Sequence, residues 1–258
     1  FYPRADWAPP PHGASDHAIT VGQGVSVGAR FYPVGPGAPA VLFFHGNGEV
    51  ASDYDDIAPL YHQQGIGLFV ADYRGYGRSG GSPTFASMVA DAHPVFEYFR
   101  DLVRKGNEGR LLRQGSGQAL FVMGRSLGSH SAIELASSYA GEMRGLILES
   151  GFAHVPSLLR HHGLTTTSPQ LDAFERAVQA RVRSIALPVL VIHGEWDTLV
   201  PPEFAHSFYE NVGSKDKTLL TIPGAGHNDI MLLGMREYFS AIGDFVTRLG
   251  REIPSTNS

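Results

Sequence analysis

The sequence predicts an α/β protein in which a mostly parallel sheet of about eight strands is covered by helices on both faces. The first observation is that short apolar runs alternate with segments of helical periodicity along the chain. The second is that most of these runs are apolar throughout, which is typical of strands buried on both sides. The third is size, because 258 residues with 43% hydrophobic side chains can bury one large core.

Short segments with the length and composition of strands recur along the chain. The first two are separated by Gly22-Gln23-Gly24, which favours an antiparallel pair of edge strands. They follow a proline-rich stretch, residues 1–15, which we expect to form an irregular arm on the surface. The expected strands are residues 18–21, 25–32, 40–44, 67–71, 119–123, 145–149, 187–192 and 218–222.

Helical periodicity fills most connections between these strands. The second long helix is expected to begin with Ser82 as its N-cap and Pro83 in its first position, where a proline needs no N–H. The expected helices are residues 51–64, 83–105, 131–139 and 229–249.

The longest connection between expected strands spans about residues 152–185 and contains no strand pattern. Val155, Leu158 and Leu159 fall at helical spacing within it, which predicts short helices. We therefore expect residues 1–258 to form a single domain with a small helical cap inserted at about 152–185.

Charge and hydropathy exclude several classes of partner. The formal net charge is -5 with both signs interspersed, so the sequence has no basic stripe and we expect no nucleic acid. No apolar run approaches the roughly 18 residues that span a bilayer, so we expect no stable membrane insertion. The chain begins Phe-Tyr-Pro without a methionine, so a leader cannot be judged, and our default expectation is a cytoplasmic protein. Oligomeric state is not predicted.

Metal and cofactor sites have no support in the sequence. The absence of cysteine excludes disulfides, thiolate metal sites and cysteine nucleophiles. His154, His161 and His162 lack further ligands at metal-site spacing, so we expect them on the cap surface and expect no metal. No Gly-x-x-x-x-Gly-Lys loop occurs and no Gly-x-Gly-x-x-Gly follows the first strand, so we expect no cofactor.

The candidate nucleophile is Ser126, in the segment Gly124-Arg125-Ser126-Leu127-Gly128 between an expected buried strand and an expected helix. In a Gly-x-Ser-x-Gly turn the glycines leave room for a sharp corner that exposes the serine Oγ above the sheet edge. The alternative is an ordinary N-cap serine.

The same pattern occurs at residues 77–81 around Ser79, which serves as an internal control. That match follows Tyr-Arg-Gly-Tyr, which is not an apolar strand, and it precedes Gly-Ser-Pro, which does not begin a helix before Pro83. We therefore interpret it as a loop.

A serine nucleophile needs a base, and the base needs an acid to orient it. His227 lies in a glycine-rich loop after the last expected strand, and Asp197 lies in the loop after the strand before it. The chain order Ser, Asp, His is that of α/β-hydrolases. Glu195, Asp229 and Glu203 remain alternative acids, and Glu195 is the strongest of them.

Other polar residues near the expected strand ends are interpreted as structural. His45 and His193 follow strands in a His-Gly pattern, and we expect both to hydrogen-bond the backbone. Arg125, Arg74 and Asp72 are expected to fix loops through hydrogen bonds.

Together the motifs resemble those of α/β-hydrolase superfamily serine hydrolases with a short cap, similar to the monoacylglycerol-lipase-like and BEM46-like groups. The resemblance covers nearly the whole chain. Its motifs are His-Gly-Asn-Gly (45–48), Asp-Tyr-Arg-Gly-Tyr-Gly (72–77), Gly-Arg-Ser-Leu-Gly (124–128), His-Gly-Glu-Trp-Asp-x-x-Val-Pro (193–201) and Gly-x-Gly-His (224–227).

The resemblance implies the α/β-hydrolase fold and a triad of Ser126, Asp197 and His227. It also implies an oxyanion hole made by the backbone N–H groups of Asn47 and Leu127. It favours Asp197 over the other acids because the family places its acid there. A dehalogenase of the same fold would have aspartate in place of Ser126.

We therefore expect a serine hydrolase that cleaves carboxylic esters through an acyl-enzyme intermediate, acting on a small-molecule acyl ester of short to medium chain length. The alternatives are a serine peptidase or amidase, a thioesterase, and a non-catalytic hydrolase-like ligand receptor. The expected substrate pocket is lined by Leu158, Leu159 and Phe174 and bordered by Glu49 and Tyr73.

Overall fold

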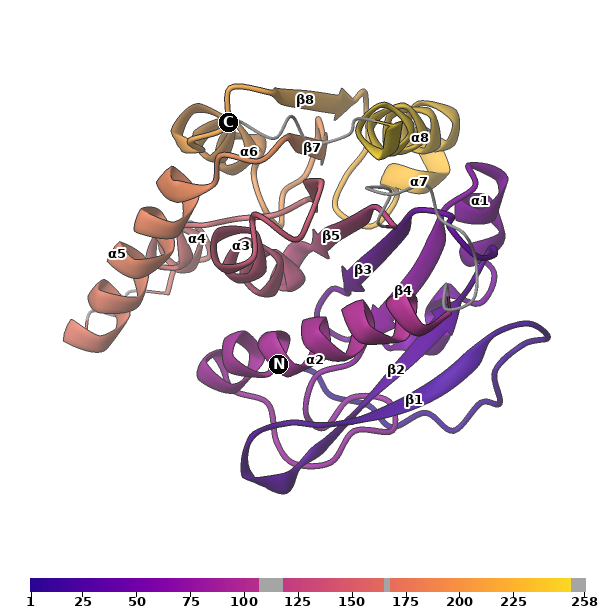
Figure 1. Cartoon of the computed structure of the whole chain (residues 1–258). Helices are drawn as coiled ribbons and strands as arrows, with labels where there is room; N and C mark the ends of the chain where they lie inside the picture. The colour runs from indigo at the N-terminus through magenta and orange to yellow at the C-terminus, as the bar shows by residue number, and fades with distance from the viewer. Residues whose placement is uncertain (107–117, 165–167, 252–258) are drawn as a thin grey trace, which may run out of the picture.

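The computed structural model describes residues 1–106, 118–164 and 168–251 and contains one eight-stranded sheet in the order β1-β2-β4-β3-β5-β6-β7-β8 (Figure 1). β2 is antiparallel to both β1 and β4, and all other neighbours are parallel, which confirms the predicted fold class. The strands are β1 (Ser15–Thr20), β2 (Ser26–Tyr32), β3 (Ala40–Phe44), β4 (Gly67–Ala71), β5 (Leu120–Arg125), β6 (Gly145–Glu149), β7 (Val189–Gly194) and β8 (Lys217–Ile222).

Helices cover both faces of this sheet (Figure 1). The helices are α1 (Ala58–Gln63), α2 (Phe85–Lys105), α3 (Ser129–Ser138), α4 (Val155–His161), α5 (Pro169–Ser184), α6 (Pro202–Asn211), α7 (Ile230–Leu233) and α8 (Met235–Arg251). Strand β3 shows the division, because Leu42 and Phe44 pack in the core with α2 and α3, whereas Val41 and Phe43 pack with α1 and α8. This alternation explains why the strand is apolar throughout.

The corner between β5 and α3 is tight. Ser126 has a φ of 50°, in the left-handed region that residues other than glycine seldom adopt. A Cβ on Gly128 would overlap the carbonyl oxygen of Phe44, and one on Gly124 would overlap the Gly128 backbone. The two glycines therefore allow β5 to turn into α3 while remaining packed against β3.

The expected helix at 51–64 is wrong as a single element. A 3-10 turn, Ala51–Tyr54, precedes α1, and α1 begins only at Ala58. Pro59 explains the break, because a proline is tolerated in the first turn of a helix but not in its interior.

Other boundaries also differ from those expected. The N-cap of α2 is Thr84, not Ser82, because Thr84 and Ser87 cap each other reciprocally through their side chains and backbone N–H groups. The expected helix at 229–249 is divided at Gly234, where the missing side chain lets the chain approach Ile222 closely.

The expected pair of edge strands is corrected at β2. This strand lies inside the sheet, between β1 and β4. The second Gly-x-Ser-x-Gly match lies in a loop, as predicted, and Ser79 Oγ accepts a hydrogen bond of 2.8 Å from Gly28 N.

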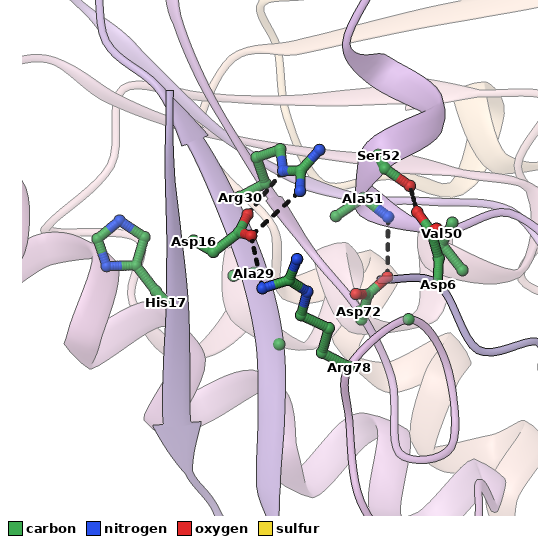
Figure 2. Close-up of a pocket in the computed structure, with 12 residues that line it drawn as sticks. Asp6, Asp16, His17, Ala29, Arg30, Val50, Ala51, Ser52, Asp72 and Arg78 are labelled. Carbon is green, nitrogen blue, oxygen red and sulfur yellow. Dashed lines mark hydrogen bonds and ion pairs between the residues drawn. The ribbon is translucent and has the colours of Figure 1, made fainter. Parts of the chain in front are cut away.

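A small polar pocket of about 30 Å³ lies where the N-terminal arm, strands β1 and β2 and the loops after β3 and β4 meet (Figure 2). Asp16 lies between two guanidinium groups, with Arg30 Nε at 2.6 Å and Arg78 Nη1 at 3.0 Å. Asp72 accepts a hydrogen bond of 2.9 Å from Ala51 N and so holds the start of the 3-10 turn after β3. The pocket is structural in character because each of these charges already has a partner.

None of the helices in residues 1–106, 118–164 and 168–251 is both long and apolar enough to cross a bilayer. The cytoplasmic location stays a prediction.

The tight corner predicts a large difference between two glycine-to-alanine substitutions. Gly128→Ala should lower the free energy of unfolding by about 3 kcal/mol, because the new methyl group meets backbone that cannot move aside. Gly141→Ala is the control, because it is exposed and nothing lies within 4 Å of its Cβ position. Its stability should change by no more than about 0.5 kcal/mol in urea denaturation. Equal urea midpoints for the two variants would contradict the tight packing of the corner between β5 and α3.

Candidate active site

Three loops at the carboxyl ends of β5, β7 and β8 bring Ser126, Asp197 and His227 together. Ser126 Oγ lies 3.0 Å from His227 Nε2, and His227 Nδ1 lies 2.7 Å from Asp197 Oδ2. Because a carboxylate only accepts hydrogen bonds, Nδ1 carries the proton and Nε2 is free to accept from the serine hydroxyl. The arrangement is therefore that of a nucleophile, a base and an orienting acid.

Asp197 is held in place by its own loop. Its Oδ1 accepts hydrogen bonds from Leu199 N at 3.0 Å and from Val200 N at 2.7 Å, which leaves Oδ2 for His227. Burial raises the pKa of Asp197, but the hydrogen bond and charge of His227, together with the Val200 N–H, outweigh it and hold the pKa below its usual value. Asp197 is therefore a carboxylate at neutral pH.

The alternative acids are used elsewhere. Glu195 Oε2 accepts a hydrogen bond of 2.8 Å from Gly224 N, and Asp229 Oδ1 accepts one of 2.6 Å from Gly226 N. Both therefore shape the loop that carries His227 without bonding its ring. Glu203 is exposed in the first turn of α6.

His45 and His193 hydrogen-bond the backbone, as predicted. His45 Nδ1 donates to Gly46 O at 2.8 Å, and Nε2 lies 3.1 Å from Asp72 Oδ1. Burial lowers the pKa of His45, but Asp72, Glu49 and the Gly46 carbonyl outweigh it and the pKa is raised. His193 Nε2 donates to Val200 O at 2.7 Å, and burial lowers its pKa.

Arg125, the residue before Ser126, links the loops of the site. Its guanidinium contacts Glu49 and lies 3.0 Å from Glu149 Oε1. It also donates to the carbonyl of His227 at 2.9 Å and to Asn228 Oδ1 at 3.0 Å. Arg125 thus connects the loop after β3, strand β6 and the loop after β8, in keeping with the predicted role of fixing loops through hydrogen bonds.

The expected oxyanion-hole residues Asn47 and Leu127 both line the cavity that contains Ser126. The loop carrying Asn47 is fixed by hydrogen bonds, because Gly46 N donates to Glu49 Oε2 at 2.6 Å. The Asn47 side chain accepts hydrogen bonds from Tyr2 N at 2.8 Å and from the Tyr76 hydroxyl at 2.6 Å. The Asn47 side chain is therefore engaged by the N-terminal arm and by Tyr76, and the oxyanion-hole role of the Asn47 and Leu127 backbones stays a prediction.

Ser126 opens on a cavity of about 680 Å³ with a mainly apolar lining. Leu158, Leu159 and Phe174 line it, as expected from the sequence. Glu49 and Tyr73 are not among the lining residues, which corrects their expected position. Glu49 is drawn to Arg125, and the Tyr73 hydroxyl donates to His45 O at 2.6 Å.

Sequence reasoning missed several apolar residues of this cavity. The missed residues include Phe85, Phe152, Val155 and Leu171. Phe85 and Phe152 lie just after an N-cap and just after a strand end, where no periodic pattern distinguishes a pocket residue from a core residue.

No group of three or more histidine or acidic side chains that could hold a metal ion occurs in the described ranges. His154 Nδ1 lies 2.6 Å from Glu175 Oε1, and its Nε2 lies 3.2 Å from Ser207 Oγ. His154 therefore joins α4, α5 and α6 in a half-buried contact, which corrects its expected place on the cap surface. His161 is exposed, and His162 donates to Leu199 O at 2.8 Å and lines the cavity.

The sheet order, the sharp turn at Ser126 and the three loops that meet there define an α/β-hydrolase. A family model described as Hydrolase_4, serine aminopeptidase S33, matches residues 36–171 and 167–231, and the chain belongs to this family. The predicted resemblance to α/β-hydrolases of the BEM46-like group is confirmed.

Individual relatives are similar over most of the chain. An uncharacterized protein of Mycobacterium tuberculosis is 28% identical over 90% of this chain and 79% of its own length. Protein bem46 of Schizosaccharomyces pombe is 29% identical over 84% of this chain and 70% of its own. The structure of the Pyrococcus furiosus esterase Pf2001 matches with a TM-score of 0.76 and 21% identity, covering 96% of this chain and 99% of the esterase chain.

The Arg125 contacts predict a marked loss of stability on substitution. Arg125→Met should lower the free energy of unfolding by about 3–5 kcal/mol, because it leaves Glu149 buried without its positive partner. Arg125→Lys should fall between that variant and the wild type, because it keeps the charge but loses the planar fork. Arg104→Met is the matched control, because Arg104 is exposed and pairs with Glu142 at the surface. Denaturation curves that shift equally for Arg125→Met and Arg104→Met would show that the buried network is dispensable.

Proposed function

We propose that this protein is a serine hydrolase that cleaves carboxylic esters through an acyl-enzyme intermediate. The observation that carries the proposal is a pair of hydrogen bonds, from Ser126 Oγ to His227 Nε2 at 3.0 Å and from His227 Nδ1 to Asp197 Oδ2 at 2.7 Å. Ser126 also lines a mainly apolar cavity. A serine in this setting needs no metal or cofactor to attack a carbonyl carbon.

In the proposed mechanism, Ser126 Oγ attacks the ester carbonyl while His227 Nε2 takes the hydroxyl proton. His227 then gives this proton to the departing alcohol, and the acyl group remains on Ser126. Water attacks the acyl-enzyme in the same way and releases the acid. Asp197 stabilises the imidazolium that forms in each step.

The developing oxyanion is proposed to be stabilised by the backbone N–H groups of Asn47 and Leu127. Each such donor contributes about 10²–10³ in rate when it is preset toward the oxyanion. The hydrogen bond from Gly46 N to Glu49 supports this role, because it fixes the loop that presents Asn47.

The cavity favours an uncharged acyl ester. The described residues that line it include no lysine, arginine, aspartate or glutamate, and its volume of about 680 Å³ suits a short to medium acyl chain. A serine peptidase that recognises an α-ammonium group would need a carboxylate near Ser126, so the amidase alternative is less favoured. We propose that α4 and α5 act as the cap, because they supply Leu158, Leu159 and Phe174 to the wall.

The first test is covalent labelling by an aryl organophosphonate. Because His227 activates Ser126, the wild-type protein should be labelled stoichiometrically at Ser126, and Ser126→Ala should not be labelled, as measured by intact-protein mass spectrometry. The same proteins should be assayed on 4-nitrophenyl acyl esters, matched acyl thioesters and aminoacyl amides.

The ester assay separates the alternatives. If the protein turns over amides or thioesters faster than esters, the proposed esterase is instead an amidase or a thioesterase. Folded wild-type protein that is neither labelled nor active would favour a ligand receptor.

The second test identifies the acid. Asp197→Asn should lower kcat by about 10³–10⁴, because the amide no longer fixes the His227 tautomer or stabilises its charge. Glu195→Gln is the matched control and should retain most activity, because Glu195 bonds Gly224 N and not the ring. The opposite ranking of kcat would show that Glu195 is the functional acid.

A further inference from the structure

His130 is a buried histidine that neither the fold nor the proposed mechanism uses. It lies in the first turn of α3, four residues after Ser126, and its side chain is 2% exposed. Neither ring nitrogen has a hydrogen-bond partner among the described residues. His45, His193 and His227, the other buried histidines of the described chain, each use at least one ring nitrogen.

The imidazole of His130 is surrounded by aromatic rings. Its ring centroid lies 4.9 Å from that of Phe152, 5.7 Å from that of Phe174 and 5.9 Å from that of Phe85. All three phenylalanines line the cavity that contains Ser126. His130 therefore lies directly behind one wall of the cavity.

This position is costly for a polar side chain. Burial lowers the pKa of His130 to about 4, so the ring is neutral at pH 7 and has one donor and one acceptor. A buried polar group without a partner carries its full desolvation penalty, which a hydrogen-bonded group recovers. An apolar residue of similar size would fill the space without this cost, so the histidine calls for a functional explanation.

We propose that His130 is a polar subsite of the substrate cavity, where it hydrogen-bonds an uncharged hydroxyl or carbonyl oxygen carried on the acyl chain. The proposal rests on the proposed esterase function of Ser126. A substrate reaches the ring when Phe85 and Phe174 turn aside. Their rings contact each other at 5.9 Å, and Phe85 is 36% exposed.

The chemistry of the surroundings sets the class of ligand. A carboxylate at this depth would need a cation, and neither lysine nor arginine occurs among the described residues of the cavity lining. A hydroxyl can donate to one ring nitrogen or accept from the other, and a carbonyl oxygen can accept from the N–H.

The test compares esters that differ in one polar atom. The substrates are the 4-nitrophenyl esters of octanoic acid, of octanoic acids with an oxo group at the fifth, sixth or seventh carbon, and of octanoic acids with a hydroxyl group at the sixth, seventh or eighth carbon. The measured quantity is the ratio of kcat/KM for each polar ester to that for the plain ester. This ratio should fall about tenfold in His130→Leu at the best position, because tenfold corresponds to about 1.4 kcal/mol, the size of one hydrogen bond between neutral groups.

Control variants separate the polar contact from packing. His130→Gln should keep a larger ratio than His130→Leu, because its amide can still donate and accept. His206→Leu should keep the wild-type ratio, because His206 is exposed on α6 and outside the cavity lining. His130→Leu should melt at or above the wild-type temperature, because two unpaired polar atoms are removed from an apolar site.

A binding measurement distinguishes this proposal from the proposed function. In the Ser126→Ala background, calorimetry of the intact esters should show tighter binding of the best polar ester than after the further change His130→Leu. Ratios and binding constants that are the same with leucine at position 130 would overturn the subsite. A wild-type protein that binds with this preference but hydrolyses no ester would overturn the esterase function and leave the subsite in place.

Discussion

The rest of the site depends on one interaction, the ion pairing of the buried Arg125 guanidinium with two carboxylates. A positive charge enclosed at the end of β5 must be balanced inside the protein, and the balance comes from Glu49 and Glu149. Burial lowers the pKa of Arg125, but these two carboxylates outweigh it and raise the pKa. Glu149 is fixed in turn by the Tyr238 hydroxyl at 2.7 Å. Glu49 and Glu149 come from a separate loop and a separate strand, and the guanidinium also donates to the carbonyl of His227. Arg125 therefore holds the turn at Ser126, the Asn47 loop and the His227 loop close together.

This dependence explains which parts of the site could be predicted from the sequence. The turn at Ser126 and the loops of Asp197 and His227 are local patterns at strand ends, and parallel strands bring their carboxyl ends to one edge. The Arg125 network is not local. Its partner Glu149 lies beside it only because β5 and β6 are neighbours with Arg125 opposite Glu149, a pairing that neither segment reveals alone. Glu49 is a second example. The sequence predicts it at the border of the pocket, but it pairs with Arg125 instead, in a tertiary contact that the local sequence does not reveal.

The fold shows the same limit at a coarser level. Apolar runs predicted all eight strands, and the alternation with helices predicted the parallel sheet. The errors occurred where one residue overrides a periodic pattern, as Pro59 does in the first turn of α1 and Gly234 does between α7 and α8. The position of β2 inside the sheet was missed because pairing with β4 joins segments far apart in sequence. Three cavity residues, Leu158, Leu159 and Phe174, were predictable because periodicity marks an apolar face of α4 and α5. Val155 and Leu171 lie on the same helices and were missed, because periodicity does not separate a cavity residue from a core residue, and Phe85 and Phe152 have no periodic pattern at all.

Three unfavourable features occur within six residues of the chain: the buried charge of Arg125, the left-handed backbone of Ser126 and the unpaired imidazole of His130. Each costs about 1–3 kcal/mol or more unless the surroundings compensate for it. The first is compensated by carboxylates, and the second by close packing of the turn, where Gly128 lies against the Phe44 carbonyl and Gly124 against the Gly128 backbone. The third has no compensation within the described chain. Proteins concentrate such unfavourable features at functional sites. We therefore look to the substrate for the hydrogen-bond partner that the His130 imidazole lacks.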